Sequence, residues 1–171
     1  MHAVDLAAET GLRVSDLLRL SWSHVGENAI VLSTGKSRHR REAVIPLHAD
    51  LRTLLERIPR RSPVILTNTR KQPWTPDGLN SSFAAAMTRA KLDDRDLHFH
   101  DLRGTAATRF YVAGLSTRMI AEIMAWEEES VERIIRRYVT RGAAIKDAIR
   151  QLDEAKSRTD FVKTGVKNAD G

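Results

Sequence analysis

The stretch TGLRVSDLLRLSW, residues 10–22, runs from the end of the first helix that the sequence predicts through the second. Residues 3–9 (AVDLAAE) predict a helix, and Gly11 follows it as the residue type that commonly ends helices. Residues 14–22 predict a second helix, with an inward face made by Leu17, Leu18 and Leu20. This stretch therefore indicates a helical start to a packed core.

Two β-branched runs follow, residues 29–33 (AIVLS) and 42–47 (EAVIPL), and they predict an antiparallel hairpin. The loop between them reads TGKSRHRR and carries four cationic side chains: Lys36, Arg38, Arg40 and Arg41. A third short strand is predicted at residues 64–66 (VIL). The sequence thus predicts a small sheet with a cationic tip.

Helices dominate the rest of the chain. Residues 49–58 predict an amphipathic helix that ends at a proline, and the further predicted helices are 78–91, 101–113, 116–126, 128–140 and 143–157. The predicted fold is α+β and mainly α: one helical domain over residues 1–157 with a small three-stranded antiparallel sheet. Residues 158–171 are polar and contain glycine, which predicts a flexible tail.

Composition restricts the possible functions. The length of 171 residues suits one domain with a sizeable core, and the net charge of +6 favours a polyanionic partner without identifying it. Cysteine is absent, which excludes disulfides, thiolate metal sites and a cysteine nucleophile. No apolar run approaches the roughly 20 residues that span a bilayer, and no leader opens the chain. We therefore expect a cytoplasmic protein without membrane contacts.

Four local sequences occur in a characteristic order: TGLRVSDLLRLSW, TGKSRHRR, HDLR (residues 100–103) and RRYV (residues 136–139). Together they resemble the catalytic domain of the tyrosine recombinases, the phage integrase family, over residues 3–141. The resemblance implies site-specific DNA recombination or integration without metal, ATP or another cofactor. It also implies a catalytic site of six residues: Arg13, Lys36, His100, Arg103, Trp126 and Tyr138.

The resemblance assigns a role to each of these residues. Arg13 and Arg103 clamp the non-bridging oxygens of the scissile phosphate, a role that suits the planar fork of donors on arginine. Lys36 protonates the departing 5′-oxygen, and like-charged neighbours in its loop would lower its pKa and favour that role. Tyr138 is the nucleophile, and His100 accepts its proton or holds the phosphate.

Other positions carry supporting roles, each with a plainer alternative. Trp126 can donate its indole N–H to a phosphate oxygen, or it is a half-buried core residue. Asp16 lies one turn from Arg13 and can orient its guanidinium, or it is a solvated helix charge. The remaining loop cations would grip the DNA backbone: Arg38, Arg40 and Arg41.

The chain departs from the family pattern in several places. Gly104 stands where the family usually has histidine, Met124-Ala125-Trp126 replaces a Leu-Gly-His triplet, and the spacing of 12 residues from Trp126 to Tyr138 is longer than usual. The N-terminal DNA-clamping domain of the family is absent from this sequence, so we expect weak DNA binding by this domain alone.

The expected partners are double-stranded DNA and sister subunits in a tetramer on paired sites. The apolar face of the last predicted helix either docks on a neighbouring subunit or packs on its own domain; it carries Ile145, Ile149 and Leu152. We expect a bacterial or phage-encoded protein of a prophage or mobile element, associated with the nucleoid.

Two other function classes remain open from the sequence. Residues 102–126 resemble a helix-turn-helix, which suits a DNA-binding protein that does not cut, either a regulator or a degenerate integrase. A type IB topoisomerase would use the same tyrosine chemistry without a partner duplex.

Overall fold

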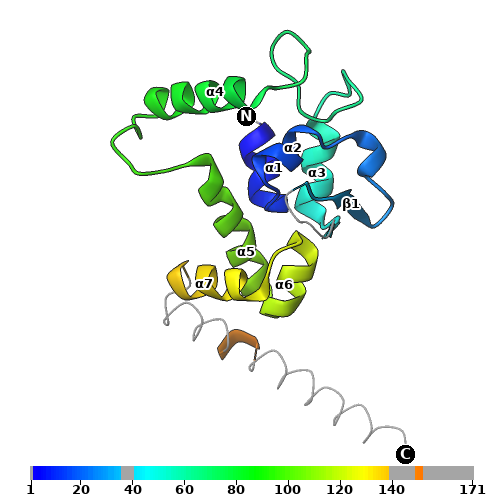
Figure 1. Ribbon diagram of the computed structural model, residues 1–171, viewed down its shortest axis with the longest axis vertical. Helices are drawn as coiled ribbons and strands as arrows, with labels where there is room; N and C mark the ends of the chain where they lie inside the picture. Colours follow the sequence, from blue (N-terminus) through cyan, green and yellow to red (C-terminus); the bar gives the residue numbers. More distant parts are fainter. Residues whose placement is uncertain (1, 36–40, 139–148, 152–171) are drawn as a thin grey trace, which may run out of the picture.

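The computed structural model describes residues 2–35, 41–138 and 149–151, and these form a mainly helical protein with one small antiparallel sheet (Figure 1). The main helices are α1 (His2–Thr10), α2 (Val14–Leu18), α3 (Ala49–Arg57), α4 (Pro76–Arg89), α5 (Leu102–Val112), α6 (Thr117–Met124) and α7 (Glu128–Tyr138). The strands are β1 (Ala29–Ser33) and β2 (Glu42–Pro46), and the 3-10 turns are η1 (Trp22–His24) and η2 (Phe99–Asp101).

Helix α1 is the centre of the core. Its buried residues lie on one face at helical spacing, and the helix packs against α5, α3 and α2. Gly11 ends α1 with a φ of +62°, and a Cβ at this position would lie 2.0 Å from Cε of Met124 and 3.1 Å from Cβ of Ala106. Only glycine therefore allows α1 to end this close to α5 and α6.

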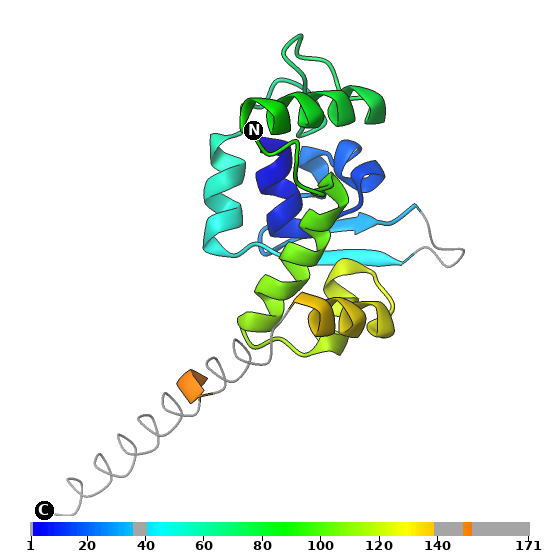
Figure 2. The same cartoon turned by 90° about the vertical axis from the view of Figure 1, so that its left-hand side faces the viewer.

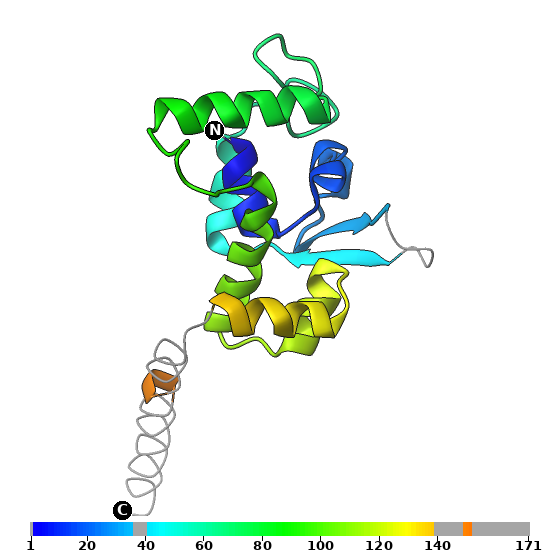
Figure 3. The same ribbon diagram turned by 60° about the vertical axis from the view of Figure 1, so that its left-hand side comes forward.

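The β1–β2 hairpin has one buried and one exposed face. Ile30 pairs with Ile45 in the antiparallel register, and both side chains are fully buried. The alternate pair, Val31 and Val44, is exposed on the outer face. Strand β2 packs on α6, so the hairpin lies between the α1–α3 core and the C-terminal helices (Figures 2 and 3).

The prediction of a third strand at 64–66 was wrong. Among the described residues the sheet has two strands, and Val64 makes only an isolated antiparallel bridge with Ser21. The backbone of this segment pairs with residues 20–22: the Ile65 N–H donates to the Leu20 carbonyl over 2.8 Å, and the Trp22 N–H donates to the Pro63 carbonyl over 3.0 Å. Because proline has no N–H to donate, the pairing does not continue on that side.

The helices predicted before residue 141 are present among the described residues, with changes at their ends. The helix predicted over residues 14–22 is shorter, since α2 ends at Leu18 and η1 follows it. Helix α4 begins at Pro76, where the Thr75 hydroxyl accepts from the Gly78 N–H over 3.1 Å. It lies at the opposite end of the molecule from α6 and α7 (Figures 1–3).

The C-terminal predictions fall mostly outside the described residues. Of the helix predicted over residues 143–157, the structure describes 149–151, which are helical, and the Ile149 side chain is 53% exposed there. Ile145, Leu152 and the predicted tail at 158–171 lie outside the described part of the chain. None of the helices described is both long and apolar enough to span a bilayer.

Candidate active site

A pocket of about 320 Å³ opens between the start of α2, the start of α5, the α6–α7 turn and α7. Four of the six predicted catalytic residues line it: Arg13, His100, Arg103 and Trp126. Its other lining residues are Arg41, Ala125, Glu127, Ser130 and Ile134. The fold therefore brings together residues that lie up to 121 positions apart in the sequence, from Arg13 to Ile134.

Arg103 is the most unusual charged group in this pocket. It lies in the first turn of α5 and is only 5% exposed. Its Nε and Nη1 atoms are buried and have no hydrogen-bond partner among the described residues. The pKa of Arg103 is lowered to about 9, mainly by burial and also by the nearby Arg13, while Asp16 acts in the opposite direction. A buried cation with unused donors is costly, and an anion in the pocket would relieve that cost.

Trp126 packs its ring against the guanidinium of Arg103. Its ring lies 4.3 Å from Cζ of Arg103, which is cation–π distance, and the residue is 8% exposed. Its indole Nε1 is also buried with no hydrogen-bond partner among the described residues. The preceding Ala125 ends α6 with a left-handed φ of 51°, which turns the chain so that Trp126 joins the pocket. Trp126 is thus buried, as its plainer interpretation held, and it also has an unused donor at the site.

Arg13 and His100 approach the pocket from separate elements. Arg13 precedes α2 in extended conformation, with φ −65° and ψ 152°, and is partly buried. His100 is exposed and lies on the turn η2, directly before α5. The HDLR segment therefore places His100 at the rim of the pocket and Arg103 inside it.

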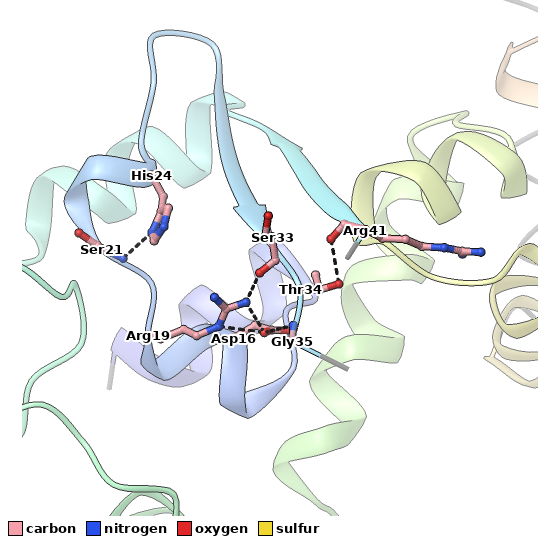
Figure 4. Close-up of polar contacts among 8 residues, drawn as sticks. All are labelled: Asp16, Arg19, Ser21, His24, Ser33, Thr34, Gly35 and Arg41. Carbon is pink, nitrogen blue, oxygen red and sulfur yellow. Dashed lines mark hydrogen bonds and ion pairs between the residues drawn. The ribbon is translucent and has the colours of Figure 1, made fainter. Parts of the chain in front are cut away.

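Asp16 links the end of α2 to the hairpin. It is 1% exposed, and its Oδ1 atom accepts from Arg19 Nη2 over 2.8 Å, from Arg19 Nε over 3.1 Å and from the Gly35 N–H over 3.2 Å (Figure 4). Arg19 also donates to the carbonyl of Ser33. The interpretation of Asp16 as a solvated helix charge was wrong. Its hydrogen bonds fix the end of β1 against α2.

Arg41 links the other side of the hairpin to the rest of the protein, as Asp16 does on the first side. Its carbonyl accepts from the Thr34 N–H over 2.8 Å and from the Thr34 hydroxyl over 3.0 Å. Its side chain extends towards α6 and α7 (Figure 4) and donates to the Trp126 carbonyl over 2.9 Å and to the Glu127 carboxylate. The hairpin base is therefore held to the protein on both strands.

Helix α7 carries the predicted nucleophile at its last residue. Ser130 and Ile134 line the pocket and are four positions apart on α7, and Tyr138 is the next position in that series. The side chain of Tyr138 is outside the described part of the structure, as are Lys36, Arg38 and Arg40.

Sequence reasoning missed several residues of the pocket. Glu127, Ser130 and Ile134 were not singled out, although spacings of four and eight residues from Tyr138 were a signal for Ile134 and Ser130. In the described ranges, no three histidine, aspartate or glutamate side chains gather closely enough to hold a metal ion.

Comparison with known proteins gives consistent findings. A sequence model of the phage integrase family matches residues 1–142 of this chain. The shufflon-specific DNA recombinase of Escherichia coli is 27% identical over 133 residues, which cover 78% of this chain and 32% of the recombinase. This chain thus spans about a third of the length of the curated relatives that it matches.

Solved structures agree with the fold. The lambda integrase catalytic core superposes with a TM-score of 0.60 at 24% identity, covering 72% of this chain and 77% of the core. A lambda integrase tetramer bound to a Holliday junction gives a TM-score of 0.60 at 22% identity, covering 76% of this chain and 41% of the integrase chain. At these identities the likeness concerns the fold alone.

Proposed function

The chain belongs to the phage integrase family, and on that basis we propose that it is the catalytic part of a site-specific DNA recombinase that cuts and rejoins strands through tyrosine. The observation that carries the proposal is the buried guanidinium of Arg103 in an open pocket, with two donors unused among the described residues. A phosphodiester has two non-bridging oxygens that can accept from such donors. The pocket therefore suits a phosphate group of DNA.

The pocket stabilises the charge that develops during phosphoryl transfer. Arg103 and Arg13 donate to the non-bridging oxygens, and the indole N–H of Trp126 supplies a further donor. Because these groups are held by packing before DNA binds, little reorganisation is needed in the transition state. The cations at this pocket thus supply the stabilisation that metal ions give in many other phosphoryl transfers.

The tyrosine step is an exchange of phosphoester bonds. The Tyr138 oxygen attacks phosphorus, a 3′-phosphotyrosine bond forms, and the bond to the 5′-oxygen breaks. His100 accepts the phenol proton or holds the phosphate, and Lys36 protonates the departing 5′-oxygen. A 5′-hydroxyl from a second duplex then reverses the step. Since one phosphoester bond replaces another, the reaction needs no ATP.

The proposed partners are double-stranded DNA and sister subunits. Arg38 and Arg40 extend the positive charge of the hairpin loop towards the DNA backbone. Recombination between two sites needs four cleavages, which supports a tetramer, and a related lambda integrase forms a tetramer on a Holliday junction. The apolar residues Ile145, Ile149 and Leu152 are proposed to dock on a neighbouring subunit. We further propose that the protein acts on nucleoid DNA in the bacterial cytoplasm.

A covalent trap tests this function. We would incubate the protein from its complete reading frame with nicked suicide duplexes made from the flanks of its gene, then map any nucleotide-bearing peptide by mass spectrometry. We expect an adduct on Tyr138 that disappears in Tyr138→Phe and persists in Tyr111→Phe, the matched control. An adduct on Tyr111 would overturn the assigned nucleophile.

The same experiment separates the alternatives. A regulator or degenerate integrase forms no adduct, and a helix-turn-helix regulator does not account for the unused donors of Arg103 and Trp126. A type IB topoisomerase relaxes any supercoiled plasmid, whereas a recombinase requires its own site and exchanges strands there.

A further inference from the structure

Glu127 is the one acidic residue among those that line the phosphate pocket in the described part of the chain. Its side chain is 64% exposed, so it is not fixed by burial. Arg103 and Trp126 line the same pocket, and their unused donors are buried at its wall. A carboxylate that turned towards them would accept their hydrogen bonds and compete with a phosphate.

Arg41 holds this carboxylate in place. Its Nη2 atom lies 2.8 Å from Oε1 and 3.0 Å from Oε2 of Glu127, so one nitrogen contacts both carboxylate oxygens. Its Nη1 atom donates over 2.9 Å to the carbonyl of Trp126, the residue before Glu127. The guanidinium therefore engages the side chain of Glu127 and the backbone that carries it.

The backbone of Arg41 makes this contact a fixed one. Its carbonyl accepts two hydrogen bonds from Thr34 across the hairpin, and β2 packs on α6. Arg41 is thus restrained at its main chain in the sheet and at its side chain on the α6–α7 turn. A cation held in this way is poorly placed to follow a DNA backbone, which was its predicted role.

We propose that Arg41 is a positioning residue that keeps Glu127 out of the anion pocket. Without Arg41, the Glu127 carboxylate turns inward and becomes an internal competitor for Arg103 and Trp126. This inference deepens the proposed function, because it assumes that the pocket receives a phosphate. It differs from a simple charge effect in one respect: the loss of Arg41 is harmful only while residue 127 carries a carboxylate.

A phosphate titration tests the proposal without target DNA. The indole N–H signals of Trp22, Trp74 and Trp126 are followed by two-dimensional NMR, with Trp126→Phe to assign the pocket signal. Inorganic phosphate is added at constant ionic strength. We expect the wild-type Trp126 signal to shift on binding, and Arg41→Gln to weaken that binding about tenfold. In a Glu127→Gln background, the same Arg41→Gln change should weaken it about twofold or less.

Two further readouts separate positioning from misfolding. In Arg41→Gln the Trp126 signal should move before phosphate is added, whereas the Trp22 and Trp74 signals and the melting temperature stay close to wild type. Arg41→Lys, which keeps one ion pair to Glu127, should bind phosphate within about threefold of wild type.

Each result has a definite meaning. If Arg41→Gln weakens phosphate binding equally in both backgrounds, or in neither, the competition by Glu127 is refuted while the pocket stands. If the wild-type Trp126 signal does not respond to phosphate, the anion pocket of the proposed function fails, and this inference fails with it.

Discussion

Replacing Arg103 with methionine should make the free protein more stable and remove the proposed anion site. The guanidinium is 5% exposed, two of its nitrogens have no partner among the described residues, and burial lowers its pKa from the ordinary value to about 9. Methionine has a similar length without the charge, so it can fill the same space above Trp126.

The expected gain follows from the shift in pKa. At about 1.4 kcal/mol per unit, the shift of Arg103 corresponds to roughly 5 kcal/mol of penalty for keeping it charged. The cation–π contact of the guanidinium with the Trp126 ring, at 4.3 Å, offsets about 2 kcal/mol of this penalty in a desolvated site. We therefore expect Arg103→Met to raise the free energy of unfolding by about 1–3 kcal/mol, as when apolar residues replace other buried ions.

Urea unfolding at neutral pH, followed by circular dichroism, measures this difference. Below about pH 9, Arg103 is protonated in both the folded and the unfolded chain, so the full penalty is present. Above that pH the folded state loses the proton first. The wild type should therefore gain stability there, and the advantage of the variant should shrink. Added phosphate should stabilise the wild type and not the variant.

Arg109→Met is the matched control, because Arg109 is on the same helix but exposed and paired with Glu9 and Asp50. The Arg109→Met variant should have a free energy of unfolding about 0–1 kcal/mol below that of the wild type. If Arg103→Met is instead less stable than wild type by 1 kcal/mol or more, Arg103 is a structural residue and the reasoning about an anion site is refuted.

Three other substitutions test the framework of the pocket in the same unfolding assay. Gly11→Ala would place a Cβ 2.0 Å from Met124 at a φ of +62°, so we expect a loss of about 1–3 kcal/mol, and a neutral result would contradict the close approach of α1. Asp16→Asn removes the buried charge that pairs with Arg19 and should cost about 3 kcal/mol; a loss below 1 kcal/mol would mean that Asp16 does not fix the hairpin. Ala125→Gly relieves a left-handed φ of 51° and should add about 0.5–1 kcal/mol, whereas a decrease would show that the methyl group packs usefully.

Local patterns were sufficient to predict most helices, and the resemblance to the phage integrase family predicted four residues of the pocket. Helical spacing of apolar residues marks α1, α3 and α7, and the TGLR and HDLR segments place Arg13, His100 and Arg103 beside helix starts. Each of these signals lies within a few residues of the position that it predicts, so it can be recognised in a single sequence.

Contacts between distant segments could not be predicted in this way. The bridge of Val64 to Ser21 replaced the expected third strand because its pairing depends on how α2 and η1 turn the chain. Likewise, Arg41 was grouped with the other cations of its loop, but its partner Glu127 is 86 positions away. Composition identifies the charge of a loop, and only the fold shows which of its side chains turn back to the protein.

The doubly anchored hairpin has a consequence for protein engineering. Thr34 and Arg41 close its base, with one strand bonded to α2 and the other to the α6–α7 turn. The bonds that define this base lie outside residues 36–40, so the loop sequence can be exchanged while the base remains. Libraries at residues 37–40, which leave the proposed general acid Lys36 unchanged, are therefore a rational starting point for altering the DNA preference of the proposed recombinase.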